Sequence, residues 1–235
     1  MRDKELYKQI LGIWSPWEVT EVELSVEAGE VTVHVGQEAG TQQSCPDCGR
    51  ACPGYDKRQR RWRHLDTCQF KTLLVAQVPR VNCPEHGVVT VTVPWAEPGS
   101  GFTALYEALV IDWLKEASIQ AVARRLSLSW NAVDGILQRA VKRGLSRRRT
   151  APVRHIGVDE TSFRKGHDYV TVVSDGKQVL HVADERKSRS LAEYYSTLTP
   201  AQKAGMVSVS MDMWPAYISA TMEHIPDARS KIAFD

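Results

Sequence analysis

Two stretches decide the fold of the C-terminal part: residues 155–162, His-Ile-Gly-Val-Asp-Glu-Thr-Ser, and residues 206–215, Met-Val-Ser-Val-Ser-Met-Asp-Met-Trp-Pro. Each stretch predicts an apolar strand that ends at an acidic residue, Asp159 in the first and Asp212 in the second. Carboxylates at the ends of buried strands are costly unless paired or metal-bound, so the two acids indicate a shared cation. Side chains alternate along a strand, so Asp159 and Glu160 face opposite sides, and we choose Asp159 as the ligand. The alternative is that each Asp is only a turn residue or helix cap.

Strand-like and helical segments alternate around these acids. A two-residue turn at Asp175-Gly176 separates two of the strands. The predicted strands cover 153–158, 169–173, 179–182, 207–211 and 231–234, and the predicted helices cover 188–198 and 215–224. We therefore expect an α/β domain over residues 152–235, with Asp159 closing its first strand and Asp212 its fourth.

Residues 102–146 carry a pattern of three helices. Ser118 and Ser129 stand where helix N-caps are needed. Ala123 is small enough for a close helix crossing, and the apolar residues that would fill the angle between the helices are Leu126, Val133 and Ile136. The segment 118–136 therefore predicts a helix-turn-helix, with Ser127 where many such motifs have Gly.

The second helix of such a motif enters the major groove of DNA through its N-terminal residues. Trp130 and Asn131 would then lie near base edges, while Arg124, Arg125 and Arg139 would contact phosphates. An ordinary helical pair is the alternative. The DNA interpretation is favoured by residues 139–154, which hold seven basic residues and no acidic one.

Two short motifs in residues 44–96 have the spacing of metal ligands. Cys45 and Cys48 are separated by two residues, and so are Cys83 and His86. Such a gap lets two ligands from one tight turn occupy adjacent corners of a tetrahedron, which predicts a structural Zn²⁺ site with no open position. The alternative is free buried cysteines beside a surface histidine. Two further cysteines, Cys52 and Cys68, compete as ligands, and we take both as small buried or partly exposed residues.

Between these two motifs lies a basic run around Trp62. It consists of Lys57, Arg58, Arg60, Arg61 and Arg63. A solvated surface is the usual explanation of such a run, but on a small metal-bound scaffold we favour phosphate contacts. Before it, residues 1–43 alternate apolar and polar positions around Ala28-Gly29, which predicts a β-hairpin with one buried face.

The composition excludes disorder and a membrane-spanning protein. The 235 residues include 30 Lys and Arg against 28 Asp and Glu, a formal charge of +2, and 43% hydrophobic residues. No apolar run reaches the roughly 18 residues that a membrane span requires. The first residues lack a secretory signal, so we expect a cytoplasmic protein.

Taken in order, these motifs resemble one family, the DDE transposases of bacterial insertion sequences, specifically the ISL-three group. The resemblance runs from about residue 44 to residue 235 and rests on the two metal motifs, residues 61–66 and 80–84, the helix-turn-helix, and residues 156–162 and 211–217. It implies a multidomain α+β chain: an N-terminal β-hairpin and zinc-binding module, a three-helix helix-turn-helix, and a partial RNase H-like domain.

The resemblance also implies the chemistry. Three acids of this family hold two Mg²⁺ ions for DNA cleavage and strand transfer, and Asp159 and Asp212 match the first two. The expected partners are double-stranded DNA at the transposon ends and a second copy of the chain, in the bacterial nucleoid.

A third acid has no counterpart in the sequence, because Glu223 comes too early. We therefore expect a truncated transposase with little or no catalytic activity. The alternatives are a DNA-binding protein without catalysis, which would act as a repressor or be a transposase remnant, and a metal-dependent nuclease of the same fold.

Overall fold

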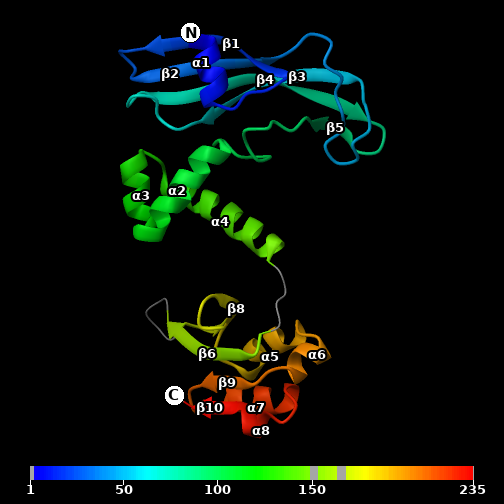
Figure 1. Ribbon diagram of the computed structural model, residues 1–235, viewed down its shortest axis with the longest axis vertical. Coiled ribbons are helices and arrows are strands. Elements are labelled where there is room, and N and C mark those ends of the chain that lie inside the picture. Colours follow the sequence, from blue (N-terminus) through cyan, green and yellow to red (C-terminus); the bar gives the residue numbers. More distant parts are fainter. Residues whose placement is uncertain (1–2, 149–152, 163–167, 235) are drawn as a thin grey trace. The chain divides into compact units, whose positions relative to one another are not determined.

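The N-terminal strands form one five-stranded sheet, in which the order is β1-β2-β4-β3 and β5 pairs with β4. The strands are β1 (Trp17–Ser25), β2 (Glu30–Gln37), β3 (Gly54–Arg63), β4 (Lys71–Cys83) and β5 (Gly87–Thr90), and α1 (Asp3–Ile10) packs near β1 (Figure 1). This computed structural model describes residues 3–148, 153–162 and 168–234. Its chain divides into two compact units, Met1–Arg147 and Arg148–Asp235.

The predicted hairpin is present as β1 and β2, but it is not a separate sheet. Strand β2 pairs in parallel with β4, with Val33 opposite Leu74. Both side chains are fully buried, and the same core contains Trp17, Trp62 and Trp95. The hairpin and the segment between the two metal motifs therefore share one hydrophobic core.

Three helices follow: α2 (Ala104–Glu116), α3 (Ile119–Leu126) and α4 (Trp130–Arg147). Ser118 accepts a hydrogen bond from the backbone N–H of Ala121 at the start of α3, and Ser129 accepts one from Ala132 at the start of α4. Ser127 ends α3 in the left-handed region, with φ of 53°, the conformation for which Gly is common at this position. The predicted three-helix module is confirmed.

The second unit contains a five-stranded sheet of order β10-β9-β6-β7-β8. Strands β6 (His155–Ser162), β7 (Tyr169–Ser174) and β8 (Val179–Asp184) are antiparallel, whereas β9 (Ser208–Met211) and β10 (Ile232–Phe234) continue from β6 in parallel. The helices are α5 (Ser188–Ser196), α6 (Pro200–Ala204), α7 (Pro215–His224) and α8 (Ala228–Lys231). This order, with the first and fourth strands adjacent, agrees with the expected RNase H-like arrangement.

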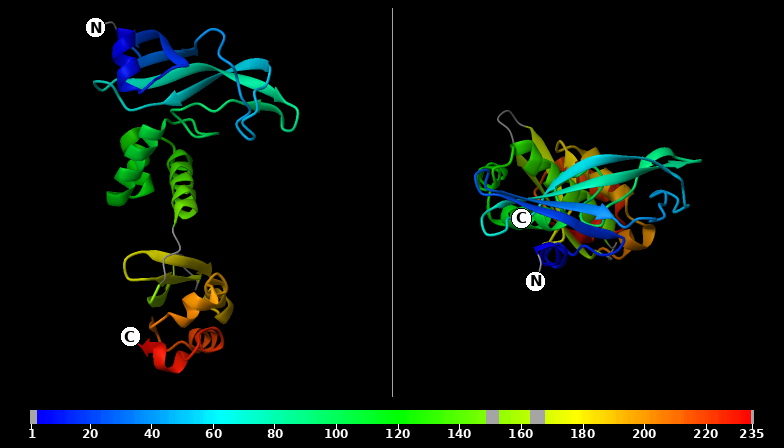
Figure 2. Two further views of the ribbon diagram at one scale, coloured as in Figure 1. Left: turned by 45° about the vertical axis from the view of Figure 1, so that its right-hand side comes forward. Right: turned by 90° about the horizontal axis from the view of Figure 1, so that it is seen from above.

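Helices α5 and α7 pack together and contribute Leu191, Tyr195 and Tyr217 to the core under the sheet (Figure 2). From β6 the core receives Ile156 and Val158, so Asp159, one residue further on, faces away from that core.

The end of the first strand of this domain was predicted wrongly, whereas the other strand boundaries differ from the prediction by at most two residues. Asp159 does not end the first strand, because β6 continues to Ser162 through its pairing with β7. The sequence did not indicate this extension, because the residues after Asp159 are polar. They belong to the strand because they pair with the antiparallel strand β7. Residues 149–152, the end of the basic stretch and the predicted start of the last domain, lie outside the described residues.

Candidate functional site

The two metal motifs come together in the first unit. The ligand atoms of Cys45, Cys48, Cys83 and His86 all lie within 4.8 Å of one another. Cys83 ends β4, and His86 follows in the tight turn before β5, where Gly87 adopts a positive φ of 67°. The β4–β5 hairpin thus presents one pair of ligands and the loop before β3 presents the other.

The spacing of the four atoms fits a tetrahedral zinc ion. Zn–S bonds of about 2.3 Å and Zn–N bonds of about 2.0 Å separate two sulfurs by about 3.8 Å and a sulfur from a nitrogen by about 3.5 Å. The Sγ atoms of Cys48 and Cys83 are 3.7 Å apart, and Nδ1 of His86 lies 3.6 Å from Sγ of Cys45 and 3.5 Å from Sγ of Cys83. The donor set therefore suits Zn²⁺, with His86 binding through Nδ1.

The electrostatics of this cluster favour the thiolate form of Cys83. The hydrogen bond with His86 lowers the pKa of the Cys83 thiol to about 6, and the same contact raises the pKa of His86. A thiolate is the form of cysteine that binds zinc. Cys83 is consequently ready to bind a metal near neutral pH.

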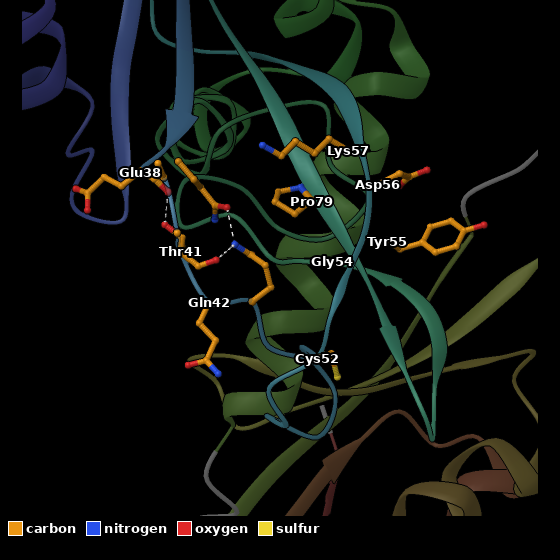
Figure 3. A pocket seen from close by; sticks show the side chains of 13 residues that line it. Glu38, Thr41, Gln42, Cys52, Gly54, Tyr55, Asp56, Lys57 and Pro79 are labelled. Carbon is orange, nitrogen blue, oxygen red and sulfur yellow. Dashed lines mark hydrogen bonds between the residues drawn. The ribbon is translucent and has the colours of Figure 1, made fainter.

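The remaining cysteines stand outside the cluster. Cys52 is buried, and its Sγ donates a hydrogen bond to the backbone oxygen of Arg50 at 3.3 Å. It lines a pocket of about 500 Å³ between the loop after β2 and the start of β3, which Tyr55 and Lys57 also line (Figure 3). Cys68 is exposed in a turn.

The two predicted acids directly follow a pair of residues on neighbouring strands: Asp159 lies within β6, and Asp212 lies one residue beyond the end of β9. The parallel ladder of β6 and β9 pairs Ile156 with Val209 and Val158 with Met211, and the next residues in each segment are Asp159 and Asp212. Both acids are exposed, and each is directly preceded by a buried apolar residue, Val158 before Asp159 and Met211 before Asp212. The pairing of Val158 with Met211 thus brings the two acid-bearing segments side by side immediately before the acids.

No third acid joins this pair among residues 3–148, 153–162 and 168–234: neither Asp159 nor Asp212 belongs to a group of three potential metal ligands. The neighbouring Glu160 is turned toward Arg186 instead, with Oε1 at 3.2 Å from Nη1. Sequence reasoning missed Arg186, which stands between a strand and a helix and belongs to no motif.

The helix-turn-helix exposes part of the predicted DNA-contacting set. Trp130 is 47% exposed at the start of α4, next to exposed Asn131. Arg124 is exposed at the end of α3, and the guanidinium of Arg125 lies 5.7 Å from the Trp113 ring centre. These four side chains are therefore available at the surface of the first unit.

Arg139 is placed differently from the expectation. Its Nε and Nη2 donate to Oε1 of Glu107 at 2.9 and 2.6 Å. Arg143 donates to Oε2 of the same carboxylate at 3.2 Å, and Ser100 donates to Oε1 at 2.8 Å. Sequence reasoning missed Glu107, since a single acid on an apolar helix gives no signal of its buried partners. Arg139 is held by an internal ion pair that joins α2 to α4.

The basic residues of β3 also divide into two groups. Arg63 is engaged internally: it pairs with Asp66, donates to the backbone oxygen of His64 at 2.6 Å and stacks over Tyr106. Arg60 lies over the Trp62 ring at 5.6 Å, and Arg61 pairs with Glu30 at 3.6 Å while remaining 61% exposed. Arg58 and Lys57 are exposed on this edge strand.

No helix within the described ranges is long and apolar enough to cross a membrane.

A cysteine-rich metal cluster, a helix-turn-helix and a sheet of this strand order, together in one chain, are the features of a DDE-type DNA transposase. Comparison with protein families agrees for each part. Residues 41–86 match the zinc-finger of transposase IS204/IS1001/IS1096/IS1165, residues 91–141 match the helix-turn-helix domain of transposase family ISL3, and residues 156–235 match the DDE transposase model of the same family. The chain belongs to transposase family ISL3.

The curated relatives that match this chain are also transposases of insertion sequences. The chain is 32% identical over 239 residues to the transposase for insertion sequence element IS1557 of Mycobacterium tuberculosis, an alignment that covers 97% of this chain and 53% of the relative. It is 25% identical over 239 residues to the transposase for insertion sequence element IS1001 of Bordetella parapertussis, which covers 100% of this chain and 58% of the relative. The chain thus spans about half the length of these relatives.

Proposed function

We propose that this protein binds the terminal inverted repeats of an insertion sequence and contributes Asp159 and Asp212 to the centre that cleaves and joins DNA strands. The observation that supports the proposal is the pairing of Val158 in β6 with Met211 in β9, because Asp159 and Asp212 directly follow these two residues. The matches to the helix-turn-helix and DDE families of ISL3 transposases support it.

The first unit is the part that recognises DNA. Trp130 and Asn131 begin α4, the helix expected in the major groove, so they are the residues proposed to contact base edges. Arg124 and Arg125 are proposed to bind phosphates beside it, and Arg58 and Arg61 on the edge strand β3 extend the basic surface. Arg60, Arg63 and Arg139 have internal partners and would support this surface from within.

Zinc has a structural role in this proposal. Cys45, Cys48, Cys83 and His86 supply all four corners of a tetrahedron, which leaves no position for a substrate. The ion would fix the β4–β5 turn against the loop before β3, and β3 carries the basic residues. Zinc binding is thereby linked to the shape of the proposed DNA surface.

The second unit supplies oxygen ligands for a divalent ion, which we expect to be Mg²⁺. Such ions, when bound, polarise the phosphodiester and stabilise the leaving oxygen in strand transfer. Asp159 and Asp212 would hold the ion through exposed carboxylates, and Asp212 is oriented by the backbone N–H of Met213, which donates to its Oδ1 at 2.7 Å. Asp159 and Asp212 correspond to two of the three acids that the resemblance to this family implies.

The test is a nicking assay with the full chain on labelled duplexes that contain the ends of its own insertion sequence. We expect specific binding at these ends and Mg²⁺-dependent nicking that Asp159→Asn and Asp212→Asn abolish. The matched control is Asp184→Asn at the end of β8. Specific binding without any nicking, in Mg²⁺ or Mn²⁺, would refute the catalytic part and favour a DNA-binding protein without catalysis. Because two ends must be brought together, we also expect two copies of the chain on paired-end DNA.

A further inference from the structure

Arg186 lies between two aromatic rings in the loop that joins β8 to α5. Its guanidinium carbon is 4.3 Å from the Tyr169 ring centre and 4.5 Å from the Trp214 ring centre. Distances of this size place the cation over the faces of both rings, where each ring attracts it. A planar guanidinium fits between two rings in a way that an ammonium group does not.

The same arginine also bonds to the segments on either side of it. Nη1 of Arg186 lies 3.2 Å from Oε1 of Glu160, whose side chain is 16% exposed. Its backbone oxygen accepts a hydrogen bond from Nε1 of Trp214 at 3.0 Å. Arg186 therefore contacts β6 through a carboxylate and the start of α7 through both a ring and a hydrogen bond.

The residues that Arg186 contacts are one or two positions away from the two acids along the chain. Glu160 directly follows Asp159, and its backbone N–H donates to Oδ1 of Asp159 at 2.8 Å. Trp214 follows Asp212 by two residues, and its backbone N–H donates to the backbone oxygen of Asp212 at 2.6 Å. Asp212 lies beyond the last ladder pair of β9, so the ladder alone does not hold it.

We propose that Arg186 is a positioning residue, which ties the segment after β9 to β6 and so fixes the separation of the Asp159 and Asp212 carboxylates. The inference rests on the proposed function, because it assumes that these acids share a divalent ion. Two carboxylates bind one ion well only at a defined separation, since each must reach it without distortion. Loosening the tie is expected to weaken ion binding without removing any ligand.

The test measures Mn²⁺ binding to the full chain by electron paramagnetic resonance, with the zinc content verified beforehand. The informative variant is Arg186→Lys, which keeps the positive charge and loses the planar stacking. We expect it to weaken Mn²⁺ binding about 3- to 10-fold. Its matched control is Arg189→Lys, an exposed arginine that pairs with Glu185 near the start of α5, and this control should bind Mn²⁺ as the unmodified chain does.

A second variant covers the case in which Arg186→Lys does not fold. Trp214→Phe keeps an aromatic ring and removes the N–H that donates to the Arg186 backbone, so it should weaken binding in the same direction. Mn²⁺ binding at unmodified affinity in folded Arg186→Lys, or in Trp214→Phe, would overturn the positioning role.

The proposed function is checked separately by Asp159→Asn. If the unmodified chain and Asp159→Asn bind Mn²⁺ equally, the shared site itself is refuted, and the positioning role with it. If Asp159→Asn loses binding and Arg186→Lys does not, the site stands and only the role of Arg186 is wrong.

Discussion

Arg139 and Glu107 form a two-point ion pair between α4 and α2, with both guanidinium contacts on one carboxylate oxygen. The Glu107 side chain is only 3% exposed, and Arg143 holds its other oxygen. A buried carboxylate needs such partners, because its charge is poorly solvated. The pair therefore ties α4 to α2 within the helical module.

Glu107→Gln should destabilise the first unit. The change removes the negative charge that compensates Arg139 and Arg143. We expect the free energy of unfolding to fall by about 2 kcal/mol. This value is smaller than the cost of breaking a fully buried pair, because both arginines are partly exposed. Denaturant unfolding measures it. Asp112→Asn, which breaks an exposed pair with Lys115 on the same helix, is the control and should cost under about 0.5 kcal/mol. Equal effects of the two changes would contradict the buried role.

Cys48→Ser should lose zinc. Serine cannot supply a thiolate, so the tetrahedron keeps three ligands and the melting temperature should fall. Metal analysis of the purified protein, together with a thermal melt, measures both effects. The matched control is Cys68→Ser, an exposed cysteine outside the cluster, which should retain zinc and melt normally. Retention of zinc by Cys48→Ser would show that the ligand set is wrong.

Stability should fall on acidification through His64. Burial lowers the pKa of this imidazole from 6.5 to about 4, and Nδ1 lies 2.8 Å from Oγ1 of Thr103, the N-cap of α2. Between these two pH values the unfolded chain binds a proton that the folded chain does not, so acid favours unfolding. The contribution is complete above pH 6.5 and is lost as the pH falls toward 4.

His64→Gln isolates this contribution, because glutamine does not titrate and can still bond to Thr103. The difference in unfolding free energy between the two proteins should shrink by on the order of 2 kcal/mol from pH 7 to pH 4.5. A difference that does not change with pH would mean that His64 is not held neutral by burial.

Two substitutions should separate phosphate contact from base contact. Arg124→Ala should weaken binding to all duplexes alike and lower the salt dependence by about one phosphate. Asn131→Ala should instead reduce the preference for the correct site by about 1 to 3 kcal/mol. Fluorescence anisotropy at several salt concentrations measures both, with Lys8→Ala on α1 as the control. The assignment fails if Arg124→Ala alters sequence preference while Asn131→Ala does not.

Local chemistry made much of the fold predictable. Serines that cap α3 and α4, and apolar positions that recur along the helices, act within a few residues, and both features appear where the sequence placed them. The Cys-x-x-Cys and Cys-x-x-His spacings likewise act within single turns. The two motifs come together because β4 pairs antiparallel with β3, so that the end of β4 lies near the loop that carries the first motif.

Pairing between strands that are far apart in the sequence was harder to predict. Nothing near Val33 or Leu74 indicates that β2 and β4 run side by side in parallel, because such pairs depend on chain segments about forty residues apart. The same reason explains the end of β6, which is set by its partner β7. It also explains why the internal ion pairs of the arginines could not be predicted. Arg63 and Arg139 look like phosphate ligands in the sequence, yet Asp66 and Glu107 engage them in the folded unit.

The sequence by itself determined the helices with their caps, the four metal ligands and the two acid-bearing strands, since each depends on residue spacing along the chain. Only the tertiary structure decided that the strands leading to Asp159 and Asp212 pair with each other, that Arg186 lies between Tyr169 and Trp214, and that Glu107 binds two arginines. These relationships are distances between remote segments, and packing of the buried cores is what fixes them.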